Sequence, residues 1–223
     1  MTITRPLWTR LTVWSFVFAG ILFVLYPAIR PFSDESSLQG ALAFASSSWL
    51  LAHSLAIAGF ILLILGLLGM CSTLRETPAG NLGLAALVVT WIGVGFTLPY
   101  YGAEAFALHA VGQEALRMNN VDLFFTLTNL IRFGEGIWVF LFGLLALAAG
   151  TVLFAIAIWR SGTFIRWSGI PLAVGFLLFI PQFFFSQPVR IGHGLLVMAG
   201  CWVLAWSIVK HGKDVGFLSF SKK

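Results

Sequence analysis

Apolar residues run along this chain in six long stretches, and the segments between them carry nearly all of the charged side chains. The stretches cover residues 11–29, 49–70, 82–107, 137–159, 167–185 and 191–209. A helix needs about 20 mainly apolar residues to cross the hydrocarbon core of a bilayer. The pattern therefore predicts an all-α integral membrane protein, with residues 1–223 forming one bundle of about six transmembrane helices.

The fifth stretch is the least regular of the six. Pro171 and Pro181 lie near its two ends, and Pro188 follows it. Proline is tolerated in a membrane helix only where neighbouring groups satisfy the carbonyl that it frees. Residues 167–185 are therefore the stretch in which we expect a spanning helix to be hardest to maintain.

The longest connection, from about residue 108 to residue 134, joins the third and fourth stretches. Asn119 and Asn120 precede an apolar run in which Asp122 lies at the start. An asparagine cap followed by an acid in the first turn is typical of a helix start. We expect a helical segment on the outer face of the bundle, either as a plain interfacial helix or as a lid.

The composition agrees with a lipid environment. Hydrophobic residues make up 59% of the chain and charged residues only 9%, against about 25% charged residues in soluble domains. The formal charge of +5 does not indicate a nucleic-acid partner, because the basic residues lie at the ends of apolar stretches and form no stripe. The partner that composition implies is the lipid bilayer.

Lysine and arginine in the connecting segments predict the orientation, because cytoplasmic loops are enriched in these residues. With the N-terminus inside, nine basic residues are cytoplasmic: Arg5, Arg10, Arg75, Arg160, Arg166, Lys210, Lys213, Lys222 and Lys223. Four are outside: Arg30, Arg117, Arg132 and Arg190. This predicts a multi-pass protein, most simply of the plasma membrane, with both termini in the cytoplasm.

Small residues recur at seven-residue spacing in two of the stretches, and each set forms one narrow stripe on a helix. The stripes are Ala52, Gly59 and Gly66 in the second stretch and Gly136, Gly143 and Gly150 in the fourth. Small residues let membrane helices approach closely. We expect both stripes to lie at helix–helix contacts.

Ionisable side chains avoid the middle of every stretch and gather at the predicted outer ends. Each inward-running stretch has a His or Glu near its outer start, namely His53, Glu135 and His193, and Glu104 lies at the outer end of the third stretch. If these four side chains face the bundle interior, they form a polar pocket beneath the outer leaflet. The residues expected to support such a pocket are Tyr100, Tyr101, Arg132, Gln182 and Arg190.

Histidine and carboxylate side chains are ligands for a zinc-like ion, which leaves a coordination position open for water or substrate. His53 and His193 could instead ligate a b-type haem. No H-E-x-x-H spacing supports either cofactor, and the residue types assign no catalytic role. Cys71 and Cys201 lie in a loop and in an apolar stretch, so we expect no disulfide between them.

Three functional classes follow from these patterns. The first is a protein with a His/Glu pocket near the outer leaflet, which binds a metal or haem and acts on a lipid-soluble or extracytoplasmic small molecule. The second is a small permease for an uncharged or lipid-like solute. The third is a structural or assembly subunit, which binds a membrane partner or a second copy of itself through its glycine stripes and outer helix.

Overall fold

The computed structural model describes residues 5–214, and Lys222 and Lys223 lie outside this range. The described residues form helices joined by short turns and contain no strand. Five helical segments are long and apolar enough to cross a membrane: Leu7–Ile29, Ser47–Leu74, Gly80–Met118, Gly136–Ser161 and Gln187–Gly212. The predicted all-α membrane bundle is thereby confirmed, although not with six long spanning helices.

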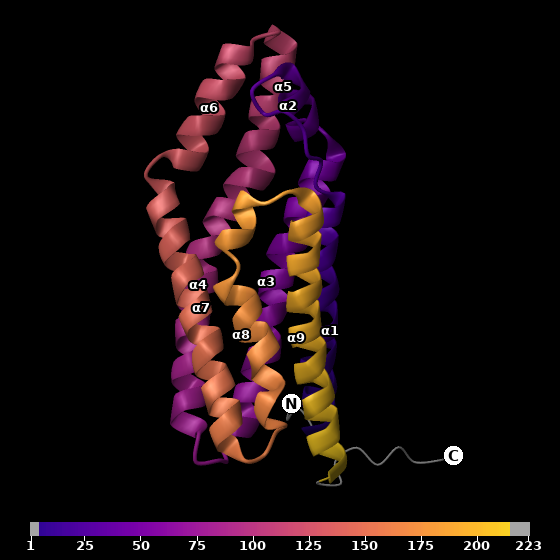
Figure 1. Ribbon diagram of the computed structural model, residues 1–223, viewed down its shortest axis with the longest axis vertical. Helices are drawn as coiled ribbons and strands as arrows, with labels where there is room; N and C mark the ends of the chain where they lie inside the picture. Colours follow the sequence, from indigo (N-terminus) through magenta and orange to yellow (C-terminus); the bar gives the residue numbers. More distant parts are fainter. Residues whose placement is uncertain (1–4, 215–223) are drawn as a thin grey trace, which may run out of the picture.

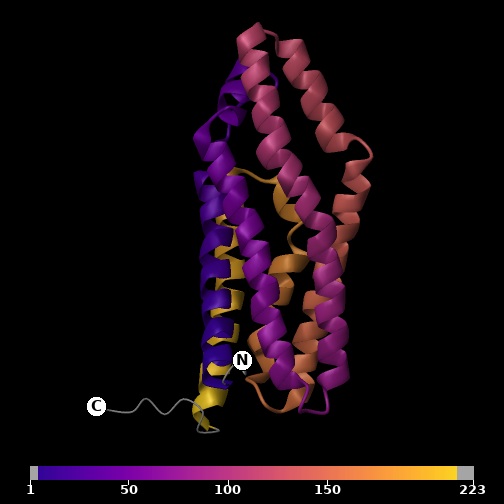
Figure 2. The same ribbon diagram turned by 180° about the vertical axis from the view of Figure 1, so that it is seen from behind.

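The main helices stand side by side in an elongated bundle (Figures 1 and 2). Their bounds are α1 (Arg5–Ile29), α3 (Ser47–Leu74), α4 (Gly80–Gly102), α7 (Gly136–Ser161), α8 (Ile170–Leu177) and α9 (Gln187–Asp214). Contacts run from α1 to α3, α3 to α4, α4 to α7, α7 to α8, α8 to α9 and α9 back to α1. The six helices therefore close a ring.

The predicted span over residues 167–185 is a broken crossing. It consists of a 3₁₀ turn, η2 (Arg166–Gly169), then α8, then a second 3₁₀ turn, η3 (Pro181–Phe184). Pro181 has no N–H to donate to the Leu177 carbonyl, so α8 ends at Leu177. Figure 1 shows the segment rising from the end of α7 to the start of α9, with α8 in its lower part and irregular chain above.

A group of helices extends the bundle at the end opposite the start of α1 and the end of α9 (Figure 1). It contains α2 (Leu38–Phe44), α5 (Leu108–Met118) and α6 (Val121–Phe133), and a π-helical turn, η1 (Ala103–Ala107), joins α4 to α5. Asn119 takes the left-handed conformation (φ 49°) between α5 and α6, and the Asn120 side chain accepts a hydrogen bond from Leu123 N at 2.9 Å. These caps produce the outer helical segment predicted between the third and fourth stretches.

Glycines mark the closest helix contacts. A Cβ at Gly143 would lie 2.9 Å from the Thr97 nitrogen, and one at Gly150 would lie 2.7 Å from the Thr90 nitrogen, so both glycines press α7 against α4. Gly136, the third member of that stripe, has no neighbouring atom within 4 Å of an added Cβ. The stripe in α3 faces α1, where Gly59 meets Leu22 and Phe23 and Gly66 meets Phe16.

Candidate binding site

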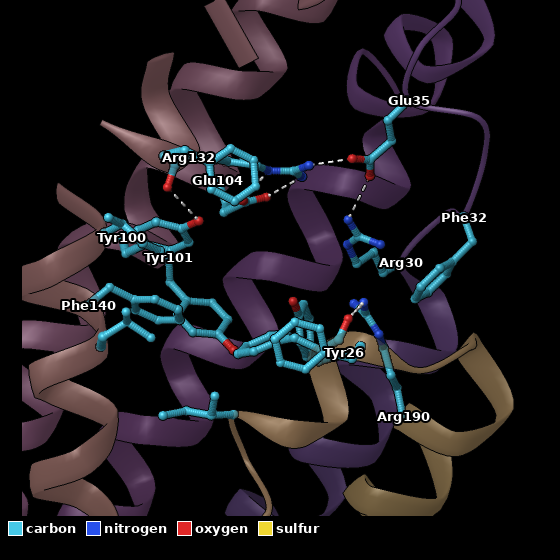
Figure 3. Close-up of a pocket in the computed structure, with 16 residues that line it drawn as sticks. Tyr26, Arg30, Phe32, Glu35, Tyr100, Tyr101, Glu104, Arg132, Phe140 and Arg190 are labelled. Atoms are coloured by element: carbon cyan, nitrogen blue, oxygen red, sulfur yellow. Dashed lines mark hydrogen bonds and ion pairs between the residues drawn. The ribbon is translucent and has the colours of Figure 1, made fainter. Parts of the chain in front are cut away.

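A cavity of about 450 Å³ lies toward the end of the ring that carries α2, α5 and α6, beside the segment that joins α1 to α2. This cavity is called the outer pocket below. Charged side chains form one part of its wall and aromatic side chains the other (Figure 3). The charged residues are Arg30, Glu35, Glu104, Arg132 and Arg190.

Arg132, on α6, is the centre of the charged wall. Its Nε and Nη2 donate to the two carboxylate oxygens of Glu104, at 2.6 and 2.9 Å, and its Nη1 donates to Glu35 Oε2. The other oxygen of Glu35 accepts a hydrogen bond of 3.1 Å from Arg30 Nη2. The result is a continuous chain, Arg30–Glu35–Arg132–Glu104, that ties three parts of the sequence together.

The environment of Arg132 keeps its guanidinium charged. Burial by itself would lower the pKa of Arg132, but the adjacent carboxylates of Glu104 and Glu35 outweigh this, and the pKa is raised above its ordinary value. Tyr100 adds a contact to the same residue, since its hydroxyl donates to the Arg132 carbonyl at 3.3 Å. Arg132 is thus a fixed positive charge at the pocket wall.

The π-helical turn η1 positions Glu104. Trp49 on α3 donates from its indole Nε1 to the Glu104 carbonyl at 2.6 Å, which satisfies a backbone group inside the widened turn. Single π-turns within α-helices are frequent at functional sites. Here the turn joins the membrane-crossing helix α4 to the outer helix α5 and keeps Tyr101 and Glu104 on the wall of the pocket.

His53 lies behind Glu104 and is completely buried. Its Nδ1 is 2.8 Å from the Trp49 carbonyl, and a carbonyl can only accept, so Nδ1 carries a proton. Its Nε2 lies 3.6 Å from Glu104 Oε2, beyond hydrogen-bond distance, and bonds to no other atom of the described chain. His53 therefore lies next to Glu104 on the side away from the cavity and does not line it.

Arg190, at the start of α9, is bound differently from the other two arginines. It donates to the main-chain carbonyls of Phe183 (Nη2, 2.6 Å) and Phe185 (Nε, 3.1 Å), and forms no ion pair with any described carboxylate. Its guanidinium lies 5.2 Å from the centre of the Phe32 ring, which Arg30 also approaches at 4.6 Å. Two guanidinium groups therefore share one aromatic ring at the edge of the pocket.

The remaining wall is aromatic and aliphatic. Tyr100 stacks on Phe140 with ring centres 4.0 Å apart and an interplanar angle of 12°. Tyr101 meets Tyr26 edge-on at 5.6 Å, and Phe183 lies 6.0 Å from Phe140. Aliphatic side chains complete this wall: Ile137, Leu141 and Ile180.

Below the pocket, the bundle is filled by packed rings. Phe23 contacts Phe60, Phe176 and Phe179 at centroid distances of 5.0, 6.0 and 6.5 Å, and Phe176 stacks on Phe179 at 5.6 Å. All four side chains are buried. The pocket therefore has an aromatic floor well above the inner end of the bundle.

Five of the residues expected from the sequence line the outer pocket: Tyr100, Tyr101, Glu104, Arg132 and Arg190. The others lie elsewhere. Glu135 is exposed at the start of α7, and neither His193 nor Gln182 lines this cavity. His193 instead places its Nε2 2.8 Å from the Gly175 carbonyl, with its ring 5.3 Å from Phe179.

Sequence reasoning missed the contribution of the first span and the loop after it. Tyr26, Arg30, Phe32 and Glu35 all line the pocket. Arg30 directly follows the end of an apolar stretch, yet it is 7% exposed and therefore belongs to the folded interior. An arginine adjacent to a span end and an acidic loop shortly after it are the signals that could have indicated an ion pair.

The geometry does not fit the zinc-like or haem site expected from the sequence. The described residues contain no group of three His, Cys, Asp or Glu side chains placed to hold a metal ion. A haem held by two histidines needs a ring nitrogen of each aimed at one iron, but His193 Nε2 is directed at a backbone carbonyl and His53 Nε2 at Glu104. The four predicted ligands do not converge.

Comparisons with protein-family models, curated proteins and solved structures found no match for this chain. The charges, hydrogen bonds and shape of the outer pocket are the features of this chain that bear on its function.

Proposed function

We propose that this membrane protein binds an amphipathic organic anion in the outer pocket. The observation that carries the proposal is Arg190, a guanidinium that lines the cavity and has no carboxylate partner among the described residues. Three arginines and two glutamates line the wall, and both glutamates are already paired with Arg132. The excess positive charge lies beside an apolar wall, where an anionic group on the ligand would offset it.

The aromatic wall supports the other part of the proposal, namely that the anionic ligand also has an apolar body. Most small-molecule sites are cavities of about 300–1,000 Å³ with mainly apolar linings and a few polar groups that fix orientation. The outer pocket, at about 450 Å³, fits this description, with Tyr101 and Phe140 on the apolar side and the arginines on the polar side. A carboxylate or phosphate ester attached to a hydrocarbon group matches both sides.

The pocket belongs near the outer leaflet if the chain has the proposed orientation. The start of α1 and the end of α9 lie at one end of the bundle, and α2 and α6 lie at the other (Figure 1). The pocket is lined by Glu35, just before α2, and by Arg132, on α6, so it lies toward this second end. The excess of lysine and arginine in the segments at the first end supports cytoplasmic termini. The proposal takes the membrane to be the plasma membrane. Residues 1–223 act in this proposal as one transmembrane unit.

Binding is favoured over transport by the aromatic floor. Secondary transporters hold their substrates near the midplane, between gates on both sides. Here Phe23, Phe60, Phe176 and Phe179 fill the bundle below the pocket. A protein that receives or presents an amphipathic anion at the outer leaflet agrees with this packing better than a permease with a continuous path.

The test is a binding isotherm for decanoate with the protein in lipid nanodiscs. Arg190→Gln removes the uncompensated charge, and because charge-assisted hydrogen bonds contribute about 1.5–3 kcal/mol, we expect affinity to fall about tenfold or more. Arg117→Gln is the matched control, since Arg117 is exposed on α5, pairs with Glu114 and does not line the pocket. Equal affinity in the wild type and the Arg190→Gln variant would contradict the proposal.

A further inference from the structure

We infer that the anion is a single-chain lipid that enters the outer pocket sideways from the outer leaflet, with its head group at the arginines and its chain extending into the bilayer. This inference rests on the proposed function and names the class of ligand and its route. Three features of the molecule support it: a thin sector in the ring of helices, exposed aromatic side chains at that sector, and ion pairs that close the pocket on the opposite side.

The thin sector lies between α7 and α9. The other positions of the ring are held by helices that are long enough to cross a membrane, whereas α8 has eight residues and rises only about 12 Å. Above α8 the ring is completed only by the four-residue turn η3. Because η3 and the preceding Ile180 together supply three residues to the pocket lining, namely Ile180, Phe183 and Phe184, the cavity lies directly behind this thin part of the wall.

Two pocket-lining side chains, one of them in this sector, are exposed on the outside of the molecule. Phe184, on η3, is 83% exposed, and Phe133, at the end of α6, is 69% exposed. Trp138, two residues into α7, is 70% exposed, and tryptophan favours the headgroup layer of a bilayer. Exposed phenylalanines near this depth lie against lipid and form an apolar mouth for the pocket.

The side toward the outer aqueous phase is closed by charged groups. The segment between α1 and α2 runs along one side of the cavity, and the side chain of its Glu35 reaches over the cavity to bridge Arg30 and Arg132 (Figure 3). A hydrocarbon chain would have to break these ion pairs in order to enter from above. From the side, the head group would pass Phe184 and the aromatic wall to reach the arginines, while the hydrocarbon chain stays in the bilayer.

The experiment uses p-benzoylphenylalanine, a photo-crosslinking residue, in place of Phe184, with alkyne-labelled palmitate in proteoliposomes. We expect labelled palmitate to be captured at position 184. When Arg190→Gln is added, capture should fall about tenfold, in step with the lost affinity. The control places the same residue at Trp91, which is 58% exposed on α4 and away from the pocket, so that its capture of lipid should not depend on Arg190.

The outcomes separate this inference from the proposed function. Capture at position 184 that is absent, or that is unchanged by Arg190→Gln, overturns the lipid route. If decanoate binding still depends on Arg190 in that case, the anion enters from the aqueous side and the proposed function stands. If decanoate binding is also independent of Arg190, both fail. The same crosslinker at Phe133 repeats the test should the protein with the substitution at position 184 fail to fold.

Discussion

Replacing Arg132 with methionine should destabilise the protein strongly, because it removes the centre of the charged wall. Arg132 donates two hydrogen bonds to Glu104 and one to Glu35, and it thereby connects α6 with η1 and with the segment after α1. Methionine retains much of the side-chain length and apolar contact. The change therefore isolates the loss of the guanidinium charge and its hydrogen bonds.

The magnitude follows from the burial of the pair. The Arg132 and Glu104 side chains are 13% and 11% exposed, so an unpaired Glu104 carboxylate would remain largely out of water. Removing one partner of a buried ion pair typically costs about 3–5 kcal/mol. Glu35 adds little to this figure, because its side chain is 34% exposed and can be rehydrated. We therefore expect a loss of about 3–5 kcal/mol in the free energy of unfolding.

The assay is equilibrium unfolding in mixed micelles, with two further variants. The double variant Arg132→Met/Glu104→Met should recover most of the loss, because replacing a whole buried pair with apolar residues is often neutral. Arg117→Met, whose side chain is 70% exposed, should leave the unfolding curve unchanged. An Arg132→Met protein within about 0.5 kcal/mol of wild type, the range of ordinary surface substitutions, would refute the reasoning.

Two further predictions concern packing and orientation. Gly150→Leu should lower the stability by about 1–3 kcal/mol or more, because its Cβ would lie 2.7 Å from the Thr90 nitrogen, while Gly136→Leu, with open space around it, should be tolerated in the same unfolding assay. In intact cells, a membrane-impermeant maleimide should label Ser33→Cys, whereas Arg75→Cys should react only after permeabilisation; the reverse pattern would overturn the proposed orientation. Both positions are exposed, and the native Cys71 and Cys201 are buried.

The helical bundle could be predicted from the sequence because apolar length alone identifies a spanning helix. The same criterion could not show that residues 167–185 form a short helix between two 3₁₀ turns. That segment is as apolar as a span, but Pro181 interrupts its helical hydrogen bonding. The interruption matters, because it leaves the thin sector behind which the outer pocket lies.

The candidate site could be predicted in part, where its residues are close together in the sequence. Tyr101 and Glu104 are three residues apart, so helical spacing alone brings them to one face. The pairing of Glu35 with Arg132 joins residues 97 positions apart and depends on how the segment after α1 folds over the pocket. The directions in which the His193 and Glu135 side chains point depend on the rotation of their helices. That rotation is set by packing against neighbouring helices and cannot be predicted from the local sequence.

The most direct test of the central claim compares three ligands with the same ten-carbon chain on the unaltered protein in nanodiscs. The ligands are decanoate, decanol and decyltrimethylammonium, and the measurement is their dissociation constant by titration calorimetry. An outer pocket with excess positive charge and an apolar wall predicts that decanoate binds about tenfold or more tightly than decanol, and that the cation binds weakest. Equal affinity for the three ligands, or preference for the cation, would contradict the account.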